Sequence, residues 1–321
     1  MHAAFSVLAF TVLSGAGLGA LALIALADIV ATVGGVELPA MPALWTRTAA
    51  LALMLVVIGL CSSVLHLANP RNAWRSAARF RTSWLSREAV FSIAFLAVAA
   101  AYVAARHFAA AAPLLLALAA VTLVLAPVVI YCTAMIYASL KPIRAWHTAR
   151  VPLAYLMLGF ASGALLVVAT LRAFGEPVTG LALIAAVLLA GAALVKLEYF
   201  HFLAGSEGSV TIGRAIGVPQ GVGPPGATSV MAARLLDAGH SRGTFLTREF
   251  VNPRRHIRPM RWLFWVASIA LPLLWLVAGL SEWRGAAAAF TACIAGLFAE
   301  RWLFFVEARH TVRLYHGDQR T

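Results

Sequence analysis

The chain has 321 residues, of which 62% are hydrophobic and only 12% are charged. Soluble domains carry about 25% charged residues, so this composition excludes an ordinary soluble protein and indicates a membrane protein. The net charge of +13 does not indicate a nucleic-acid partner. The basic residues are divided among several short loops, which is typical of topology signals.

Eight segments are long and apolar enough to cross the hydrocarbon core, which takes about 20 helical residues. The first has no basic n-region and is too long for a signal-peptide core, so we expect a retained helix. Lipid cannot satisfy free backbone groups, so the spans must be helical. We therefore predict an all-α polytopic membrane protein, a single domain over 1–321, with a bundle of eight transmembrane helices near 5–30, 44–67, 88–107, 112–139, 152–174, 178–203, 261–280 and 286–308.

Most of the 25 Lys and Arg residues lie on one predicted side of the membrane. That side holds both termini and the loops near 68–87, 140–151 and 204–260. The opposite side holds four arginines, which are Arg47, Arg106, Arg172 and Arg284. Because cytoplasmic loops are rich in Lys and Arg, we expect both termini in the cytoplasm and membrane lipid around the spans.

The stretch HLANPRNAWRSAARFRTSWLSRE, residues 66–88, connects the second and third spans. His66 falls in the last predicted turn of the second span, with Ser62 one turn earlier on the same face. Ser86 is expected to cap the third span, which would place Glu88 in its first turn, where the helix dipole favours an anion. Histidine can move a proton, so His66 and Glu88 are candidates for proton exchange at the membrane surface. Each also has a plain structural explanation, as a histidine that reaches water or a glutamate at a helix start.

Arg71, Arg75 and Arg79 are spaced by four, which predicts one face of a short interfacial helix. Trp74 and Trp84 suit the membrane–water boundary. This basic face can lie on anionic lipid, meet an acidic partner, or do both. The loop 204–260, which has a Gly- and Pro-rich middle, is a second candidate docking segment for a soluble subunit, or else a basic loop on lipid headgroups.

Charged residues inside later spans are costly and need partners. We expect structural ion pairs, either Lys196 with Glu300 or Glu198 with Arg301, and proton transfer is the alternative. Tyr131 and Tyr137 can donate hydrogen bonds to a ligand or belong to the core.

No metal site is expected in this chain. Cys61, Cys132 and Cys293 form no CxxC motif, and we interpret them as small buried hydrophobic residues rather than ligands of an iron–sulfur cluster. Haem would need facing histidines, and the spacing of His66, His201 and His310 does not indicate them.

Three stretches resemble the dimethyl sulfoxide reductase membrane-anchor subunit family. They are the start of the chain (His2–Val7 and SGAGLG at 14–19), the 66–88 stretch, and the tail EARHTVRLYHG from Glu307. In the divergent 204–260 loop, RLLD (Arg234–Asp237) and LTREF (Leu246–Phe250) are similar to the cytoplasmic sulfite dehydrogenase branch.

The resemblance implies a complex of three subunits in a bacterial cytoplasmic membrane. A molybdopterin subunit would perform the substrate chemistry, a four-cluster iron–sulfur subunit would carry electrons, and this haem-free chain would exchange them with ubiquinone or menaquinone. The family's quinone-reactive histidine corresponds to His66 and its quinone-linked glutamate to Glu88. Around this pair we expect quinone contacts from Ser62, Arg71, Trp74 and Tyr131, and partner docking by Arg71, Arg75, Arg79 and Arg81.

The predicted sidedness favours a sulfite dehydrogenase over an exported reductase that oxidises menaquinol. Two further hypotheses are a transporter whose intramembrane charges form an ion path, and an anchor without a quinone site.

Overall fold

The computed structural model describes residues 5–36, 38, 41–65, 70–206, 256–279 and 283–309. Across these ranges the chain is helical, without strands, and eight helices are long and apolar enough to span a membrane. The all-α, eight-span prediction is confirmed. The elements are α1 (Phe5–Gly34), α2 (Pro42–Val64), η1 (Pro70–Arg79), α3 (Trp84–His107), α4 (Ala112–Ala138), α5 (Arg150–Ala173), α6 (Thr179–Ser206), α8 (Ile257–Leu263), η3 (Phe264–Ala270), α9 (Leu271–Ala278) and α10 (Trp283–Val306).

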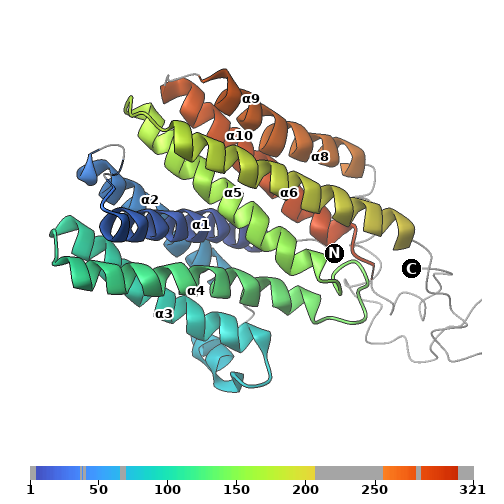
Figure 1. Cartoon of the computed structure of the whole chain (residues 1–321). Coiled ribbons are helices and arrows are strands. Elements are labelled where there is room, and N and C mark those ends of the chain that lie inside the picture. Colours follow the sequence, from blue (N-terminus) through green and yellow to red (C-terminus); the bar gives the residue numbers. More distant parts are fainter. Residues whose placement is uncertain are drawn as a thin grey trace, which may run out of the picture.

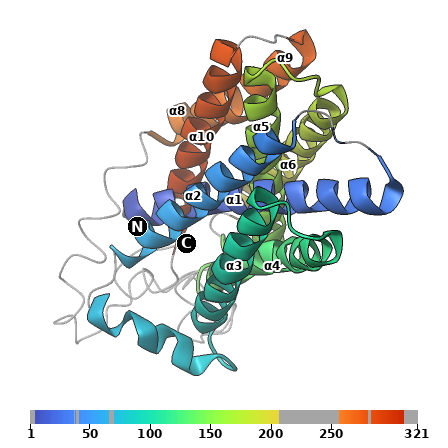
Figure 2. The same cartoon turned by 90° about the vertical axis from the view of Figure 1, so that its left-hand side faces the viewer.

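Helices α1 and α5 form the centre of the bundle (Figures 1 and 2). In the most apolar 18-residue stretch of each, 72% and 78% of residues are buried, against 28% in the corresponding stretches of α2, α4 and α6. Helix α1 packs against α2, α4 and α5, and α5 in turn packs against α6 and α10. The outer helices therefore present one face to lipid, whereas α1 and α5 are enclosed by protein.

Small residues allow α1 and α5 to approach each other closely. A Cβ built on Gly163 would lie 2.8 Å from the Cα of Gly19, and one on Gly19 would lie 3.0 Å from the Cα of Phe160. On the other side of α1, a Cβ on Gly17 would lie 3.0 Å from the backbone nitrogen of Val56 in α2. The SGAGLG stretch thus supplies the close helix contacts that membrane bundles use in place of a hydrophobic driving force.

The seventh span combines α8, η3 and α9, and η3 is a π-helical segment. Pro272 follows it at the start of α9. Proline has no backbone N–H and clashes with the carbonyl four residues earlier, and a wider turn before it accommodates both effects. The Ser268 hydroxyl in η3 donates to the Cys293 carbonyl at 2.9 Å, which holds this turn against α10.

Both described ends of the chain lie at the same end of the bundle, where the Phe5 ring stacks on Phe298 with centroids 5.4 Å apart. Helices α3 and α5 also begin there, and α4, α6 and α10 end there (Figure 1). We call this the basic end, because it carries the arginines of η1.

One expectation about the cysteines is wrong. Cys132 and Cys293 are buried as predicted, but Cys61 is exposed on the outer face of α2. The outer face of a membrane helix contacts lipid, where a small apolar side chain is as well accommodated as in the core.

Candidate functional site

Glu88 is a buried carboxyl group near the start of α3, with 7% of its surface exposed. Its Oε1 lies 2.5 Å from the hydroxyl of Thr133 on α4. The predicted cap is wrong: Ser83 is the N-cap residue and accepts a hydrogen bond from the Ser86 backbone N–H. Helix α3 therefore begins at Trp84 and Glu88 lies in its second turn, inside the bundle instead of at the helix start.

The region differs from the prediction because Ser86 has another partner. Its hydroxyl donates to the backbone carbonyl of Ser76 in η1. This contact ties η1 to the start of α3.

Thr133 links Glu88 to the bundle interior and was not anticipated from the sequence. The Thr133 hydroxyl also lies 3.1 Å from the carbonyl of Val129. A hydroxyl has one hydrogen, so it can donate either to the Glu88 carboxylate or to this carbonyl. In the second case the short contact requires a protonated Glu88 as the donor. The pair can therefore accommodate both protonation states of Glu88.

Two aromatic rings and an arginine pack together near the start of α3, where Glu88 also lies. Trp84, one turn before Glu88, meets Tyr131 edge to face at 5.8 Å, and Tyr131 is 41% exposed. The Arg87 guanidinium lies 4.2 Å from the Trp84 ring centre and donates to the carbonyls of Phe80 and Arg81. We call Trp84, Arg87 and Tyr131 the aromatic rim. Tyr131 thus contacts Trp84, which lies one turn before Glu88 on α3, and its role as a quinone contact stays a prediction.

The other predicted quinone contacts are His66, Ser62, Arg71 and Trp74. His66 lies outside the described residues, as does the side chain of Arg71. The Ser62 hydroxyl lies within hydrogen-bond distance of the carbonyls of Gly59 and Ser6, so it links α2 to the start of α1. Trp74 is 70% exposed and its ring lies 5.5 Å from the Arg75 guanidinium.

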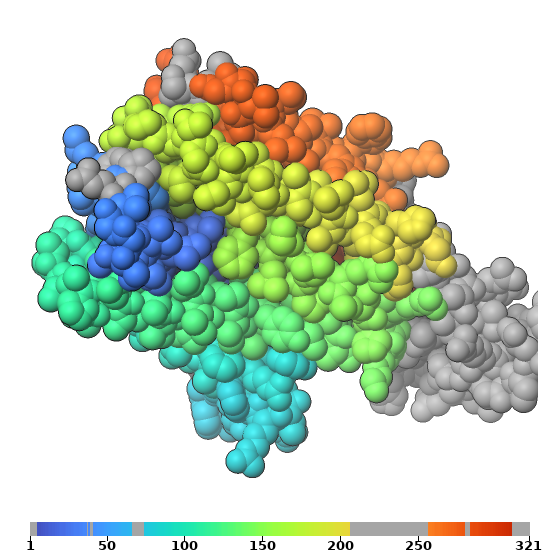
Figure 3. Space-filling view, in the orientation of Figure 1, coloured from blue at the N-terminus to red at the C-terminus, as the bar shows by residue number. Residues whose placement is uncertain are grey.

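The arginine segment is a 3-10 helix from Pro70 to Arg79, not an α-helix. A 3-10 helix has three residues per turn, so positions spaced by four point in different directions. The expectation that Arg71, Arg75 and Arg79 share one face is therefore wrong. Arg75, Arg79 and Arg81 are nevertheless exposed, and Figure 3 shows this segment, in cyan, projecting beyond α3 and α4. Most of the predicted docking loop, residues 207–255, lies outside the described part of the chain.

A buried ion cluster lies deeper at the basic end. The Lys196 Nζ is 2.6 Å from Glu300 Oε1, with side chains 2% and 0% exposed, which confirms the first predicted pair. The second pair is wrong, because Arg301 binds the other oxygen of Glu300. Glu198 instead pairs with Arg150 at 2.6 Å in an exposed position.

Aromatic residues surround this cluster. The Arg301 guanidinium lies 3.8 Å from the Tyr155 ring centre. The predicted ligand donor Tyr137 lies in the same core, packed against Trp146 and Phe304. At the edge, Arg261 pairs with Glu307 just beyond α10. Burial raises the pKa of the Glu307 carboxyl above its ordinary value, and Arg261 opposes this effect.

A second buried ionic group lies at the opposite end of the bundle. Asp28 on α1 accepts hydrogen bonds from Tyr102 and Arg106 on α3. The sequence contained a signal for it, a lone carboxylate within the first predicted span. In the described ranges no group of three or more His, Cys, Asp or Glu residues is arranged to hold a metal ion.

Comparisons with known proteins agree over nearly the whole chain. The model of a family described as DMSO reductase anchor subunit (DmsC) matches residues 1–305. The chain is also similar to a sulfite dehydrogenase subunit of Allochromatium vinosum, at 35% identity over 337 aligned residues that cover 98% of this chain and 99% of the relative. No solved structure matches the chain.

Proposed function

We propose, since the chain belongs to the DMSO reductase anchor-subunit family, that it passes electrons between an iron–sulfur partner subunit and a membrane quinone. Reduction of a quinone to a quinol takes up two electrons and two protons, and oxidation releases them. Electrons would come from or go to the partner's nearest iron–sulfur cluster. The contribution of this chain is to bind the quinone near that partner and to exchange its protons.

The observation that carries the proposal is the placement of Glu88. It is a buried carboxyl group that can give or accept a proton at Thr133, beside a rim of Trp84 and Tyr131 that is open to lipid. A quinone ring can reach such a site from the membrane, since aromatic rings provide flat apolar contacts. General acid–base groups need a protonatable atom within hydrogen-bond reach of the reacting oxygen.

His66 is proposed as the second proton-exchanging residue. It follows the end of α2 by two positions, and the family resemblance assigns the quinone-reactive histidine to it. Ser62, Arg71 and Trp74 are proposed as further quinone contacts. The quinone used, ubiquinone or menaquinone, is the one that the membrane around the complex contains.

The partner subunits are proposed from the family and its relative. A four-cluster iron–sulfur subunit would dock on the exposed arginines of the η1 segment, and a molybdopterin catalytic subunit would bind that partner. The relative, named as a sulfite dehydrogenase subunit, favours a sulfite dehydrogenase, with the basic end and both termini in the bacterial cytoplasm. A reductase that oxidises menaquinol is the second candidate, supported by the family description.

The test uses the purified complex that contains this chain. Glu88→Gln keeps the size of the side chain and removes its acid–base function, so quinone-coupled turnover should fall about 100-fold. Turnover with an artificial acceptor that takes electrons directly from the iron–sulfur subunit should stay unchanged. His66→Ala should give the same pattern in an assembled complex.

Glu198→Gln is the matched control, because Glu198 is an exposed glutamate at the same end of the bundle. It should retain quinone-coupled turnover. Normal quinone-coupled turnover in Glu88→Gln would show that the proposed role of Glu88 is wrong.

A further inference from the structure

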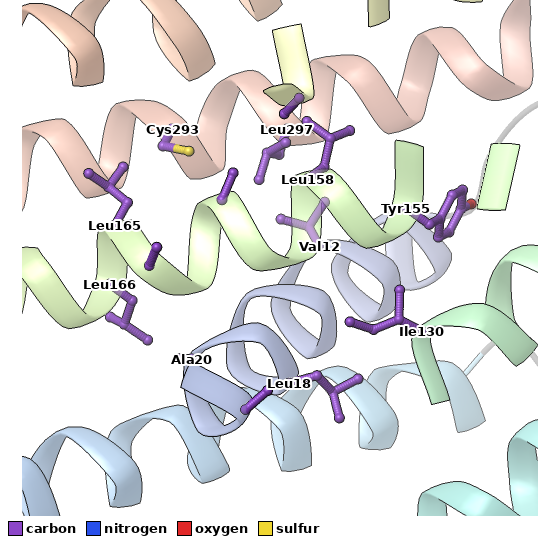
Figure 4. Packing of buried hydrophobic residues seen from close by; sticks show 14 of the residues in the cluster. Val12, Leu18, Ala20, Ile130, Tyr155, Leu158, Leu165, Leu166, Cys293 and Leu297 are labelled. Atoms are coloured by element: carbon purple, nitrogen blue, oxygen red, sulfur yellow. The ribbon is translucent and has the colours of Figure 1, made fainter. Parts of the chain in front are cut away.

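A small polar cavity lies between α1, α4, α5 and α10, directly behind Thr133. Its volume is about 30 Å³. Figure 4 labels several residues that line it, among them Val12, Ile130, Tyr155 and Leu158. The polar groups that line it come from all four helices and are Thr11, Ser14, Thr133, Tyr155, Ser162 and Arg301.

Two of these groups are buried donors that need a partner. The Tyr155 hydroxyl and the Arg301 Nη1 interact with each other, but neither makes a hydrogen bond of good geometry with the part of the chain that the structure describes. Leaving such a buried group unpaired costs about 1–3 kcal/mol. In contrast, Ser14 and Ser162 donate to carbonyls of their own helices at 2.6 and 2.7 Å, and so they keep lone pairs that can accept. The cavity therefore presents both donors and acceptors.

The small volume of the cavity limits which ligands it can hold. A volume of about 30 Å³ holds about one or two water molecules and excludes a quinone ring. Water also matches the polar groups, because a buried water makes about three hydrogen bonds as both donor and acceptor.

We propose that this cavity is a water site, and that Glu88, Thr133, the water and Tyr155 form the chain through which Glu88 exchanges its proton. This proposal rests on the proposed function of Glu88. When Glu88 gives a proton to a quinone, it takes one from Thr133, Thr133 takes one from the water, the water takes one from Tyr155, and Tyr155 takes one from solvent water at the basic end. Each member gives one hydrogen and receives one. Arg301 keeps its charge, because guanidinium does not deprotonate in proteins, and it orients the water.

The water site lies nearer to the basic end of the bundle than to the opposite end. Glu88 and Tyr155 lie within two turns of the starts of α3 and α5, and Arg301 lies at a similar depth from the end of α10, all at the basic end. Toward the other end, α1 continues for ten residues from Leu18 at the cavity to Asp28, which is about 15 Å. The intervening residues include five apolar side chains with no exposed surface, which are Ala20, Leu21, Ala22, Ile24 and Ala25. They separate the cavity from Asp28 along α1.

The main test removes single hydroxyl groups in the purified complex. Thr133→Val and Tyr155→Phe should each slow quinone-coupled turnover about tenfold or more, because the proton path is interrupted. The solvent isotope effect in heavy water should rise as proton delivery becomes limiting. Thr133→Ser keeps the hydroxyl and should restore turnover. Thr122→Val is the control, since the buried Thr122 hydroxyl on the same helix is not part of the cavity.

The outcomes separate this proposal from the function on which it rests. Tyr155→Phe does not touch Glu88, so a slow variant with a raised isotope effect supports the water chain even if Thr133→Val does not assemble. If Thr133→Val and Tyr155→Phe turn over normally while Glu88→Gln is slow, the water chain is wrong and the role of Glu88 stands. If Glu88→Gln also turns over normally, the proposed function itself is wrong.

The water can be detected independently by radical footprinting with X-rays, which labels residues next to bound water. Tyr155 should be labelled several-fold more than Tyr102, a buried tyrosine whose hydroxyl already bonds Asp28. Equal, low labelling of both tyrosines would overturn the assignment of water to the cavity.

Discussion

Lys196 and Glu300 are 104 positions apart in the chain and form an ion pair with almost no exposed surface, with Nζ and Oε1 2.6 Å apart. Glu300 also binds Arg301 through its second oxygen. One carboxylate therefore bridges two buried cations, which makes Glu300 the centre of the cluster.

The first prediction is that loss of the Glu300 charge destabilises the bundle more than loss of the Lys196 charge. Glu300→Gln leaves Lys196 and Arg301 without a carboxylate and should destabilise the bundle by about 3–5 kcal/mol. Lys196→Met leaves Glu300 paired with Arg301 and should cost much less. Thermal unfolding in detergent can be followed by thiol labelling, because Cys132 and Cys293 are buried. Equal destabilisation by both substitutions would contradict this account.

The labelling experiment needs a background without the exposed thiol. Cys61→Ser removes the cysteine that is accessible before unfolding. The signal then reports only the two core thiols.

The second prediction concerns the contact between α1 and α5. Gly163→Ala places a methyl group against Gly19 with no space for it, so we expect a loss of about 1–3 kcal/mol as the helices move apart. Gly180→Ala is the matched control at an exposed helical position, with nothing within 4 Å of its built Cβ. It should be neutral or slightly stabilising, and a loss equal to that of Gly163→Ala would argue against a packing effect. Both can be measured in the same thiol-labelling assay.

Composition and helical length were enough to predict the eight spans, because lipid leaves a chain of this kind no other structure. Helix boundaries were harder to place. Ser83 and Ser86 both precede the apolar run, and only the bond from Ser86 to the Ser76 carbonyl decides which of them caps α3. The distance from Glu88 to the membrane surface depends on that choice.

The ion pairs could likewise be predicted only in part from the sequence. Buried charges need partners of opposite charge, and this requirement correctly predicted the pair of Lys196 and Glu300. Positions 196 and 198 are two residues apart on α6, so they lie on nearly opposite sides of the helix. Glu198 therefore faces outward and meets Arg150, a partner that spacing along the chain cannot reveal. The bond between Glu88 and Thr133 is likewise hidden, because a threonine in a span usually bonds its own helix. The family resemblance itself was recognised correctly from three short stretches.

The third prediction tests the docking surface proposed for the iron–sulfur subunit. Arg75 and Arg79 are exposed on η1, so Arg75→Glu with Arg79→Glu should reverse the local charge and weaken binding of an acidic partner. We expect less of the partner to co-purify, and a greater loss at low salt, where charge repulsion is screened least. The control is Arg284→Glu at the opposite end of the bundle. Undiminished co-purification with the double variant would move the docking surface elsewhere.

The fourth prediction concerns the ionic group at the far end of the bundle. Asp28→Asn removes the charge that neutralises Arg106, whose side chain is 6% exposed. An uncompensated buried charge costs about 3–5 kcal/mol, and we expect a loss of that order in the thiol-labelling assay. Asp28→Leu combined with Arg106→Leu removes both charges, and it should be more stable than Asp28→Asn because no charge is left unpaired. A double variant as unstable as the single one would show that the hydrogen bonds matter more than the charge balance. Neither change should alter quinone-coupled turnover per assembled complex, because Asp28 lies at the end of the bundle opposite to Glu88.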